Sequence, residues 1–307
     1  MANFSASDAA FAGFAFVRRQ PQAVLIWTSV LLVISAGFSV LVTSRFAPVL
    51  GQLATVTPQS MQDPTKAMAI YRQVLPLYGD LFLFAIVFYP IVFSAMNRAV
   101  LRPKESAFGF FRLGPDELRQ FGLMLSFIAL GIVSYIAVLM VAIVLTLIVG
   151  AVTAASQSQA LTAIAILTVP VIAMFGYLVF AVRFSLASAQ TFATRKIDIF
   201  GSWALTKGRF WPIFGAYLLA TILALIVTLL GYIIIFAVAA VTGGAGNMMN
   251  ALTPATPTMG AIFTAPKIIQ LVLGAILGAI TWPVLMLPAP TIYKAVVGDG
   301  ASASDVF

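Results

Sequence analysis

Residues 120–150 read QFGLMLSFIALGIVSYIAVLMVAIVLTLIVG, and this run contains no charged side chain. A helix that spans a bilayer needs about 20 consecutive apolar residues, so the run is long enough to cross the hydrocarbon core. In lipid the backbone must satisfy its own hydrogen bonds, which a helix does within one segment. The run therefore predicts a transmembrane helix and an integral membrane protein.

The composition of the whole chain agrees with this interpretation. Of the 307 residues, 62% are hydrophobic and 8% are charged, whereas about a quarter of the residues of a soluble domain are charged. This excludes an ordinary soluble enzyme, a disordered chain and a nucleic-acid-binding domain, so we expect no nucleic acid partner. The chain contains no Cys and no His, which excludes disulfides, thiolate metal sites and His-based acid–base chemistry. We expect no cofactor and no metal.

Five other apolar runs are also long enough to cross a membrane. The sequence thus predicts an all-α polytopic membrane protein with six transmembrane helices in three hairpins. The predicted spans are residues 21–44, 77–97, 120–150, 160–182, 211–241 and 268–289. We expect one membrane domain over the whole chain, with a disordered tail at 296–307.

Lysine and arginine residues lie mainly in alternate connections between these spans. Thirteen of the 17 precede the first span, join the second to the third or the fourth to the fifth, or follow the sixth. Because cytoplasmic loops collect Lys and Arg, this distribution predicts a multi-pass protein of the bacterial inner membrane with both termini in the cytoplasm. In the longest outer connection, 46–75, we expect a short helix that Asp63 caps and Pro64 begins.

A related pattern precedes each odd-numbered span. It reads AFAGFAFVRRQP at 10–21, AFGFFRLGP at 107–115 and IFGSWALTKGRFWP at 199–212. Each copy combines Phe, Gly, further aromatics and a basic residue with a Pro that opens a helix. The pattern predicts interfacial amphipathic helices and a threefold parallel repeat with units near 5–100, 101–195 and 196–295. The alternative is a general aromatic belt with positive-inside anchoring.

Each even-numbered span contains a proline inside its apolar run. These residues are Pro90, Pro170 and Pro283. A proline removes one backbone hydrogen bond and kinks the helix. The three prolines are therefore hinge candidates around a shared cavity, or else static kinks that improve packing.

The basic residues beside the helical entry points are candidates for binding anionic lipid headgroups. They are Arg98, Arg102, Lys104, Arg195, Lys196, Lys207 and Arg209. Membrane lipids are the partners that we expect for them. The alternative is that these charges only set the topology.

Two further features have a functional and a structural interpretation. Asp80 is an ion-site candidate because it is the one acid near a span interior, but at the start of the second span it can also cap the helix. Gly274 and Gly278 form a GxxxG pattern that lets helices approach closely. The pattern serves helix packing within the chain or the seam of a homo-oligomer.

Residues 198–220 read DIFGSWALTKGRFWPIFGAYLLA. This segment resembles a pattern in uncharacterised bacterial six-span integral membrane proteins, which are similar to the membrane domain attached to some glycerophosphodiester phosphodiesterases. The match covers about 20 residues around this segment. The phosphodiesterase domain itself is missing, and its His-dependent site needs a residue type that this chain lacks. The resemblance therefore implies a membrane module and does not imply hydrolysis.

No nucleophile motif, phosphate loop or paired carboxylate stands out, so we expect no enzyme. Asp116 and Glu117, at the start of the third span, suit the positive end of a helix dipole. The leading hypothesis is a non-enzymatic inner-membrane protein that organises lipid or scaffolds a protein partner. The alternative is a transporter or carrier for a small or lipid-like solute, which predicts a polar cavity between the proline-bearing spans.

Overall fold

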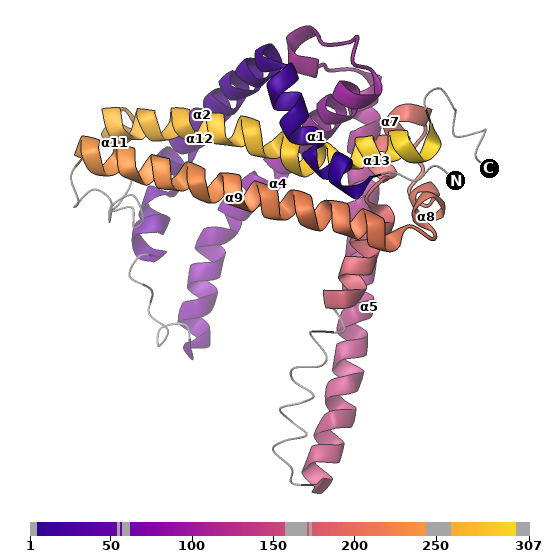
Figure 1. Ribbon diagram of the computed structural model, residues 1–307. Coiled ribbons are helices and arrows are strands. Elements are labelled where there is room, and N and C mark those ends of the chain that lie inside the picture. Colours follow the sequence, from indigo (N-terminus) through magenta and orange to yellow (C-terminus); the bar gives the residue numbers. More distant parts are fainter. Residues whose placement is uncertain are drawn as a thin grey trace.

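The computed structural model describes residues 5–53, 56, 62–156, 171, 174–243 and 259–298, and every regular element in these ranges is a helix (Figure 1). The predicted all-α fold is confirmed for this part of the chain. The long helices are α2 (Pro21–Leu53), α4 (Pro64–Leu101), α5 (Pro115–Ser156), α9 (Phe210–Gly243) and α12 (Ala265–Met286). The short ones are α1 (Ala6–Arg19), η1 (Ala107–Phe110), α7 (Ala187–Thr194), α8 (Gly201–Thr206), α11 (Met259–Ile262) and α13 (Pro288–Val297).

Five helices are long and apolar enough to cross a membrane, and they match five of the six predicted spans. The predicted fourth span, 160–182, lies mostly outside the described residues, although residues 174–184 are helical. The predicted tail at 296–307 also lies mostly outside them, while α13 continues to Val297. The sixth span therefore stays a prediction.

Local sequence signals account for most helix starts. α2, α4, α5 and α13 each begin at a proline, whose fixed φ and missing N–H suit the first helical position. Asp63 caps α4 as predicted, because its side chain accepts a hydrogen bond from the Thr65 N–H at 3.0 Å. However, α4 then runs unbroken through Pro76 to Leu101. The predicted short outer helix and the second span are thus one continuous helix.

Helices α9 and α12 lie side by side and run in opposite directions, which gives the third predicted hairpin (Figure 1). α12 also packs on α2. Its Ala275 and Ala279 are buried, and such small side chains allow helix backbones to approach closely. α12 therefore contacts both α9 and α2 closely.

Helix α5 differs, because its outer part projects away from the other described helices (Figure 1). No residue in its most apolar 18-residue window is buried, and Val133, Tyr135 and Leu147 are all exposed. Packing against neighbours sets the orientation of a membrane helix. Its predicted partner at 160–182 is mostly undescribed, so the arrangement in three hairpins stays a prediction for α5.

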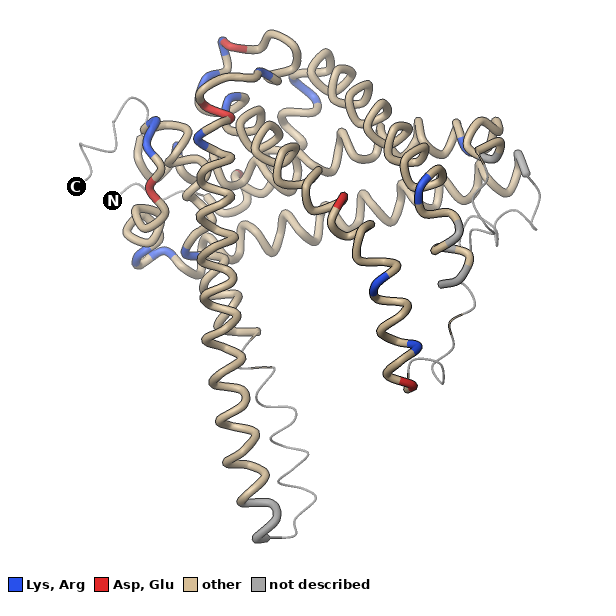
Figure 2. Tube along the Cα trace, turned by 180° about the vertical axis from the view of Figure 1, so that it is seen from behind, with Lys and Arg blue, Asp and Glu red and all other residues tan. Residues whose placement is uncertain are grey.

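Most of the tightly packed interior lies where the short helices gather. We call this region the basic end: it comprises α1, η1, α7, α8, α13 and the adjoining ends of α2, α4, α5, α9 and α12. Figure 2 shows that most Lys and Arg residues lie there. Its core includes Trp27, Met96, Phe110, Leu186 and Ile292, each 1% exposed or less. The basic end is therefore a folded layer that can hold side chains in fixed positions.

Candidate lipid interface

The first repeated segment forms α1, which begins where the Ser5 side chain accepts a hydrogen bond from the Asp8 N–H at 3.3 Å. Phe11 points outward and is 48% exposed. On the opposite side Gly13 packs directly on α12, where an added Cβ would collide with the backbone of Pro283 and Val284. α1 thus lies across the end of α12 with its aromatic residue exposed.

The second repeated segment forms η1. Phe108 is 81% exposed, whereas Phe110 is buried. Between them Gly109 has a φ of +63°, and an added Cβ would lie 3.1 Å from the Trp27 ring. Trp27 Nε1 donates a hydrogen bond to the Gly109 carbonyl at 2.6 Å. A side chain at position 109 would therefore disturb both the backbone and this buried contact.

The third repeated segment forms α8. Phe200 is 67% exposed. Gly201 follows it and packs against Gln190 and Asp198 so closely that an added Cβ would collide with both side chains. The Asp198 carboxylate also accepts a hydrogen bond from the Gly201 N–H at 2.8 Å. Hence Phe points outward and Gly packs inward in all three segments.

Arg98, a predicted headgroup residue, is instead buried in an ionic network. Its side chain is 2% exposed, and Nη2 lies 2.6 Å from Glu117 Oε1. Its Nη1 donates to the Phe110 carbonyl at 2.6 Å. Because these partners occupy the guanidinium and cover it, Arg98 has no surface for a lipid headgroup. We therefore reassign Arg98 to the interior of the basic end.

Arg102 belongs to the same ionic network. Its Nη1 lies 2.9 Å from Asp116 Oδ2, and its guanidinium carbon lies 4.5 Å from the centre of the Phe192 ring. Arg119 pairs with the other Asp116 oxygen at 2.8 Å. Asp116 and Glu117 lie in the first turn of α5, where acidic residues suit the helix dipole as predicted. They also form ion pairs with arginines, which was not predicted from the sequence. Across the described ranges no group of three acidic side chains is placed to hold a metal ion.

A separate, neutral hydrogen-bond chain joins α4, α5 and α7. Asn97 Nδ2 donates to Ser188 Oγ at 2.9 Å, and Ser188 Oγ donates to Gln120 Oε1 at 2.9 Å. Gln120 Nε2 donates in turn to the Ser188 carbonyl at 2.8 Å. Sequence reasoning missed these residues, because isolated amides and hydroxyls carry no recognisable motif.

The remaining predicted headgroup residues are more accessible. Lys104, Arg195, Lys196 and Lys207 are exposed, and Arg209 is half-buried. Among the residues that the structure describes, none of these five forms an ion pair within 4.0 Å. Four of them flank α7 and α8. The structure therefore concentrates accessible positive charge at the third entry point.

Arg183 adds a cation at the same place, although it is not among the headgroup residues predicted from the sequence. Its guanidinium carbon lies 5.3 Å from the Trp203 ring centre, and Nη1 lies 3.5 Å from Thr206 Oγ1. Its Nε is buried without a hydrogen-bond partner in the described part of the chain. The nearby Asp198 is engaged by Gln190 and Gly201. No acid of the described ranges pairs with Arg183.

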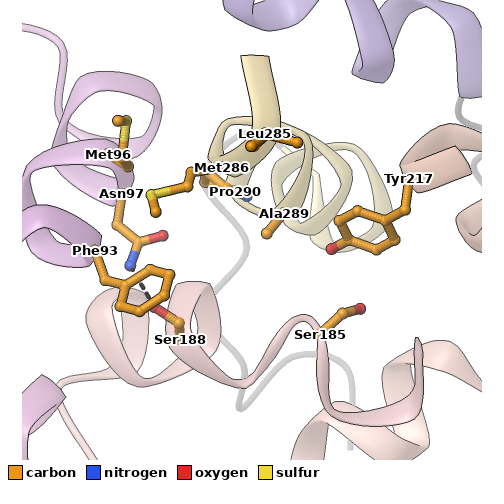
Figure 3. Close-up of a pocket in the computed structure, with 10 residues that line it drawn as sticks. All are labelled: Phe93, Met96, Asn97, Ser185, Ser188, Tyr217, Leu285, Met286, Ala289 and Pro290. Atoms are coloured by element: carbon orange, nitrogen blue, oxygen red, sulfur yellow. Dashed lines mark hydrogen bonds between the residues drawn. The ribbon is translucent and has the colours of Figure 1, made fainter. Parts of the chain in front are cut away.

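A cavity of about 170 Å³ lies between the last turns of α4, the turn before α7, α9, and the α12–α13 junction (Figure 3). Its lining includes apolar side chains and four polar ones, of which only the Tyr217 hydroxyl lacks a hydrogen-bond partner among described residues. The lining residues of α4 and α12 follow Pro90 and Pro283 in the chain. The cavity thus lies at the basic end.

The predicted hinge prolines are placed unequally. Pro90 and Pro283 are both buried within their helices, and the backbone at Pro283 is in contact with Gly13 of α1. Pro170 lies outside the described residues. Close packing around Pro283 fits a fixed kink better than a moving one, because interiors of this density resist deformation.

Asp80 lies in the interior of α4, so the interpretation that it caps a helix start is wrong. Pro76 suggested a boundary, but one proline interrupts only its own backbone hydrogen bond and the helix continues. The Asp80 carboxylate lies 2.9 Å from Arg45 Nη1 of α2. The ion-site candidate therefore already has a cation beside it.

Of the two glycines in the GxxxG pattern, Gly278 packs against another described helix and Gly274 does not. An added Cβ at Gly278 would lie 3.1 Å from Leu31 of α2, whereas nothing lies within 4 Å of one at Gly274. Ala275 and Ala279 are buried on the packed face. Packing within the chain thus involves Gly278, Ala275 and Ala279, and Gly274 lies off the packed face.

The resemblance of residues 198–220 to the membrane domain of glycerophosphodiester phosphodiesterases stays a sequence-based expectation. Comparison of the chain with protein-family models, with curated proteins and with solved structures finds no match.

Proposed function

We propose that the chain is a non-enzymatic protein of the bacterial inner membrane that organises anionic lipid at the cytoplasmic leaflet. The observation that carries this proposal is the positive charge around α7 and α8, which has no acidic partner among the described residues and lies next to outward-pointing aromatic rings. Such a surface provides the two attractions, electrostatic and apolar, that hold an interfacial segment at a membrane.

The two largest basic segments differ in how their charge is balanced. Near η1, the arginines pair with acids that lie between α4 and α5 or in the first turn of α5: Glu105, Asp116 and Glu117. Around α8, the cations have no such partners among described residues: Arg183, Arg195, Lys196, Lys207 and Arg209. Each basic residue near an anionic surface contributes about 1 kcal/mol of attraction. The third segment is therefore the stronger binding surface.

Aromatic side chains flank this charge. Phe200 and Trp211 are 67% and 70% exposed, and Trp203 is 45% exposed. Tryptophan is enriched at membrane–water interfaces, where its ring meets the acyl boundary and its N–H reaches polar groups. The Arg183 guanidinium lies over the Trp203 ring, and a guanidinium group is well suited to binding a phosphate. Together these residues suit a phospholipid headgroup with its chains beside the rings.

The Phe–Gly pairs support the threefold repeat as part of this proposal. Each short helix contacts an element at the end of an even-numbered span: α1 contacts α12 and α13, η1 contacts α4, and α8 contacts α7. In each case Phe faces outward and Gly packs inward. Three parallel units would place all three Phe residues at one membrane surface, with both termini on that side.

Lipid retention tests the proposal. The protein is purified in detergent with phosphatidylglycerol or phosphatidylcholine, and bound lipid is counted by native mass spectrometry. Loss of two charges in Lys207→Gln with Arg209→Gln should weaken phosphatidylglycerol retention by up to roughly 30-fold, from about 1 kcal/mol per charge. Phosphatidylcholine retention should not change.

The matched control removes two charges from the start of α4, Lys66→Gln with Arg72→Gln. This control has the same net charge as the test variant, so it separates local binding from overall charge. It should retain phosphatidylglycerol like the unmodified protein. Equal retention by both double variants, with melting temperatures unchanged, would overturn the proposal.

A further inference from the structure

We infer that the cavity between α4, α9 and the α12–α13 junction is a binding site for a small uncharged molecule with an apolar ring and one hydroxyl group. This inference is independent of lipid binding, because none of the cavity residues belongs to the cationic surface around α8. It rests on the size of the cavity, the chemistry of its lining and the position of one side chain.

The size fits a single ring. The cavity is partly open and has a volume of about 170 Å³, which is close to the volume of about 150 Å³ of an apolar cavity known to bind benzene. Two of its lining side chains, Met96 and Met286, come from different helices. Methionine has a flexible, polarisable side chain that adapts to the shape of a ligand. The site can therefore fit closely around an aromatic or cyclic body.

The lining excludes a charged ligand. Its apolar members are Phe93, Met96, Leu285, Met286, Ala289 and Pro290, and its polar members are Asn97, Ser185, Ser188 and Tyr217 (Figure 3). Of the described residues that line the cavity, none is a Lys, Arg, Asp or Glu. Because an ion transferred to such a site would lose its hydration without gaining a counter-charge, a neutral molecule is required.

Three of the polar side chains already have partners. Asn97 Nδ2 donates to Ser188 Oγ, which donates to Gln120. Ser185 Oγ donates to the Val182 carbonyl at 2.8 Å. These contacts hold the wall in place and use the donor hydrogens of the two serines, whereas the Ser185 oxygen beside Tyr217 can still accept a hydrogen bond. They do not themselves call for a ligand.

Tyr217 is different. Its hydroxyl is buried and has no hydrogen-bond partner among the described residues, and Figure 3 shows it pointing into the space beside Ala289 and Ser185. A buried hydroxyl without a partner costs about 1–3 kcal/mol, which a ligand hydroxyl would recover.

The test uses 4-fluorophenol and fluorobenzene as probes of the full-length protein in detergent, with binding measured by fluorine NMR line broadening. The two probes share the ring, and only 4-fluorophenol carries the hydroxyl. Tyr217→Phe should weaken 4-fluorophenol binding about tenfold, the value of one hydrogen bond to a buried group. Fluorobenzene should bind the unmodified protein and this variant equally.

Two further variants distinguish binding of the probes in this cavity from their partitioning into the detergent micelle. Tyr232→Phe removes a hydroxyl from the exposed face of the same helix and should leave both probes unaffected. Ala289→Phe fills the cavity and should abolish binding of both. The inference is overturned if 4-fluorophenol binds the unmodified protein, Tyr217→Phe and Tyr232→Phe with equal affinity, or if neither probe binds the unmodified protein.

Discussion

Arg98 Nη2 and Glu117 Oε1 lie 2.6 Å apart, and their side chains are only 2% and 7% exposed. The pair joins the end of α4 to the first turn of α5. An ion pair taken out of water is stable only with good geometry and further hydrogen bonds, and here Arg98 Nη1 donates one to the Phe110 carbonyl. The contact therefore ties two predicted repeat units together.

Breaking this pair from one side should be costly. Arg98→Met leaves the Glu117 carboxylate buried without its cation, which typically lowers the free energy of unfolding by about 3–5 kcal/mol. The melting temperature in detergent, followed by tryptophan fluorescence, measures the loss. Arg112→Gln is the control, because its pair with Glu105 is 47% and 36% exposed and should change stability by at most about 1 kcal/mol. Equal effects of the two substitutions would show that Arg98 is not held in a buried pair.

The crossing of α1 over α12 should depend on the absence of a side chain at Gly13. Gly13→Ala places a Cβ against the backbone of Val284, which we expect to cost about 1–3 kcal/mol by overpacking. Gly274→Ala adds the same methyl group where nothing lies within 4 Å, so it should be neutral or slightly stabilising. Melting temperatures of the two variants distinguish the cases, and a destabilisation confined to Gly274→Ala would contradict the packing described.

Asp80 should act as an ordinary surface partner of Arg45. The two side chains are 25% and 60% exposed, and exposed ion pairs contribute about 0–1 kcal/mol. Asp80→Asn should therefore change the melting temperature little and should not introduce or remove a dependence on sodium or potassium. A cation-dependent stability that disappears in Asp80→Asn would instead identify Asp80 as an ion site.

The orientation in the membrane can be mapped directly, because the chain has no native cysteine. Single substitutions Lys104→Cys and Lys196→Cys introduce one thiol at an exposed residue of the basic end. In spheroplasts, whose outer membrane has been removed and whose inner membrane is intact, a membrane-impermeant maleimide should label neither variant. Met68→Cys, at an exposed position near the start of α4, should be labelled. Labelling of the variants at 104 and 196 would reverse the topology.

Local rules predicted much of this fold. Prolines at helix starts and the Asp63 cap depend on neighbouring residues only, and both appear as expected. The extent of α4 could not be predicted in this way, because Pro76 is a boundary signal that a long helix can accommodate. At Gly274 and Gly278, sequence spacing indicated a small-residue face, but the position of α2 decides that only Gly278 meets Leu31.

The candidate site was predicted less completely. Lys207 and Arg209 were identified from their charge and their position beside a span. The burial of Arg98 was missed, since it depends on η1 turning back so that the Phe110 carbonyl faces α4. That turn uses three consecutive residues with positive φ, two of them Phe, which sequence preferences do not favour. The proposed role of Tyr217 was missed, because the cavity that its hydroxyl faces is formed together with α4, the α7 region and the α12–α13 junction.

The length of α5 has a consequence for the membrane around it. Its charge-free stretch of 31 residues, 120–150, extends about 46 Å at 1.5 Å per residue, whereas the hydrocarbon core is about 30 Å thick. Such excess is accommodated by tilting the helix or by thickening the bilayer locally, at a free-energy cost that grows with the mismatch. Where α5 crosses the bilayer as predicted, we expect the protein to respond to acyl-chain length, with the first residues of the stretch held in the basic end.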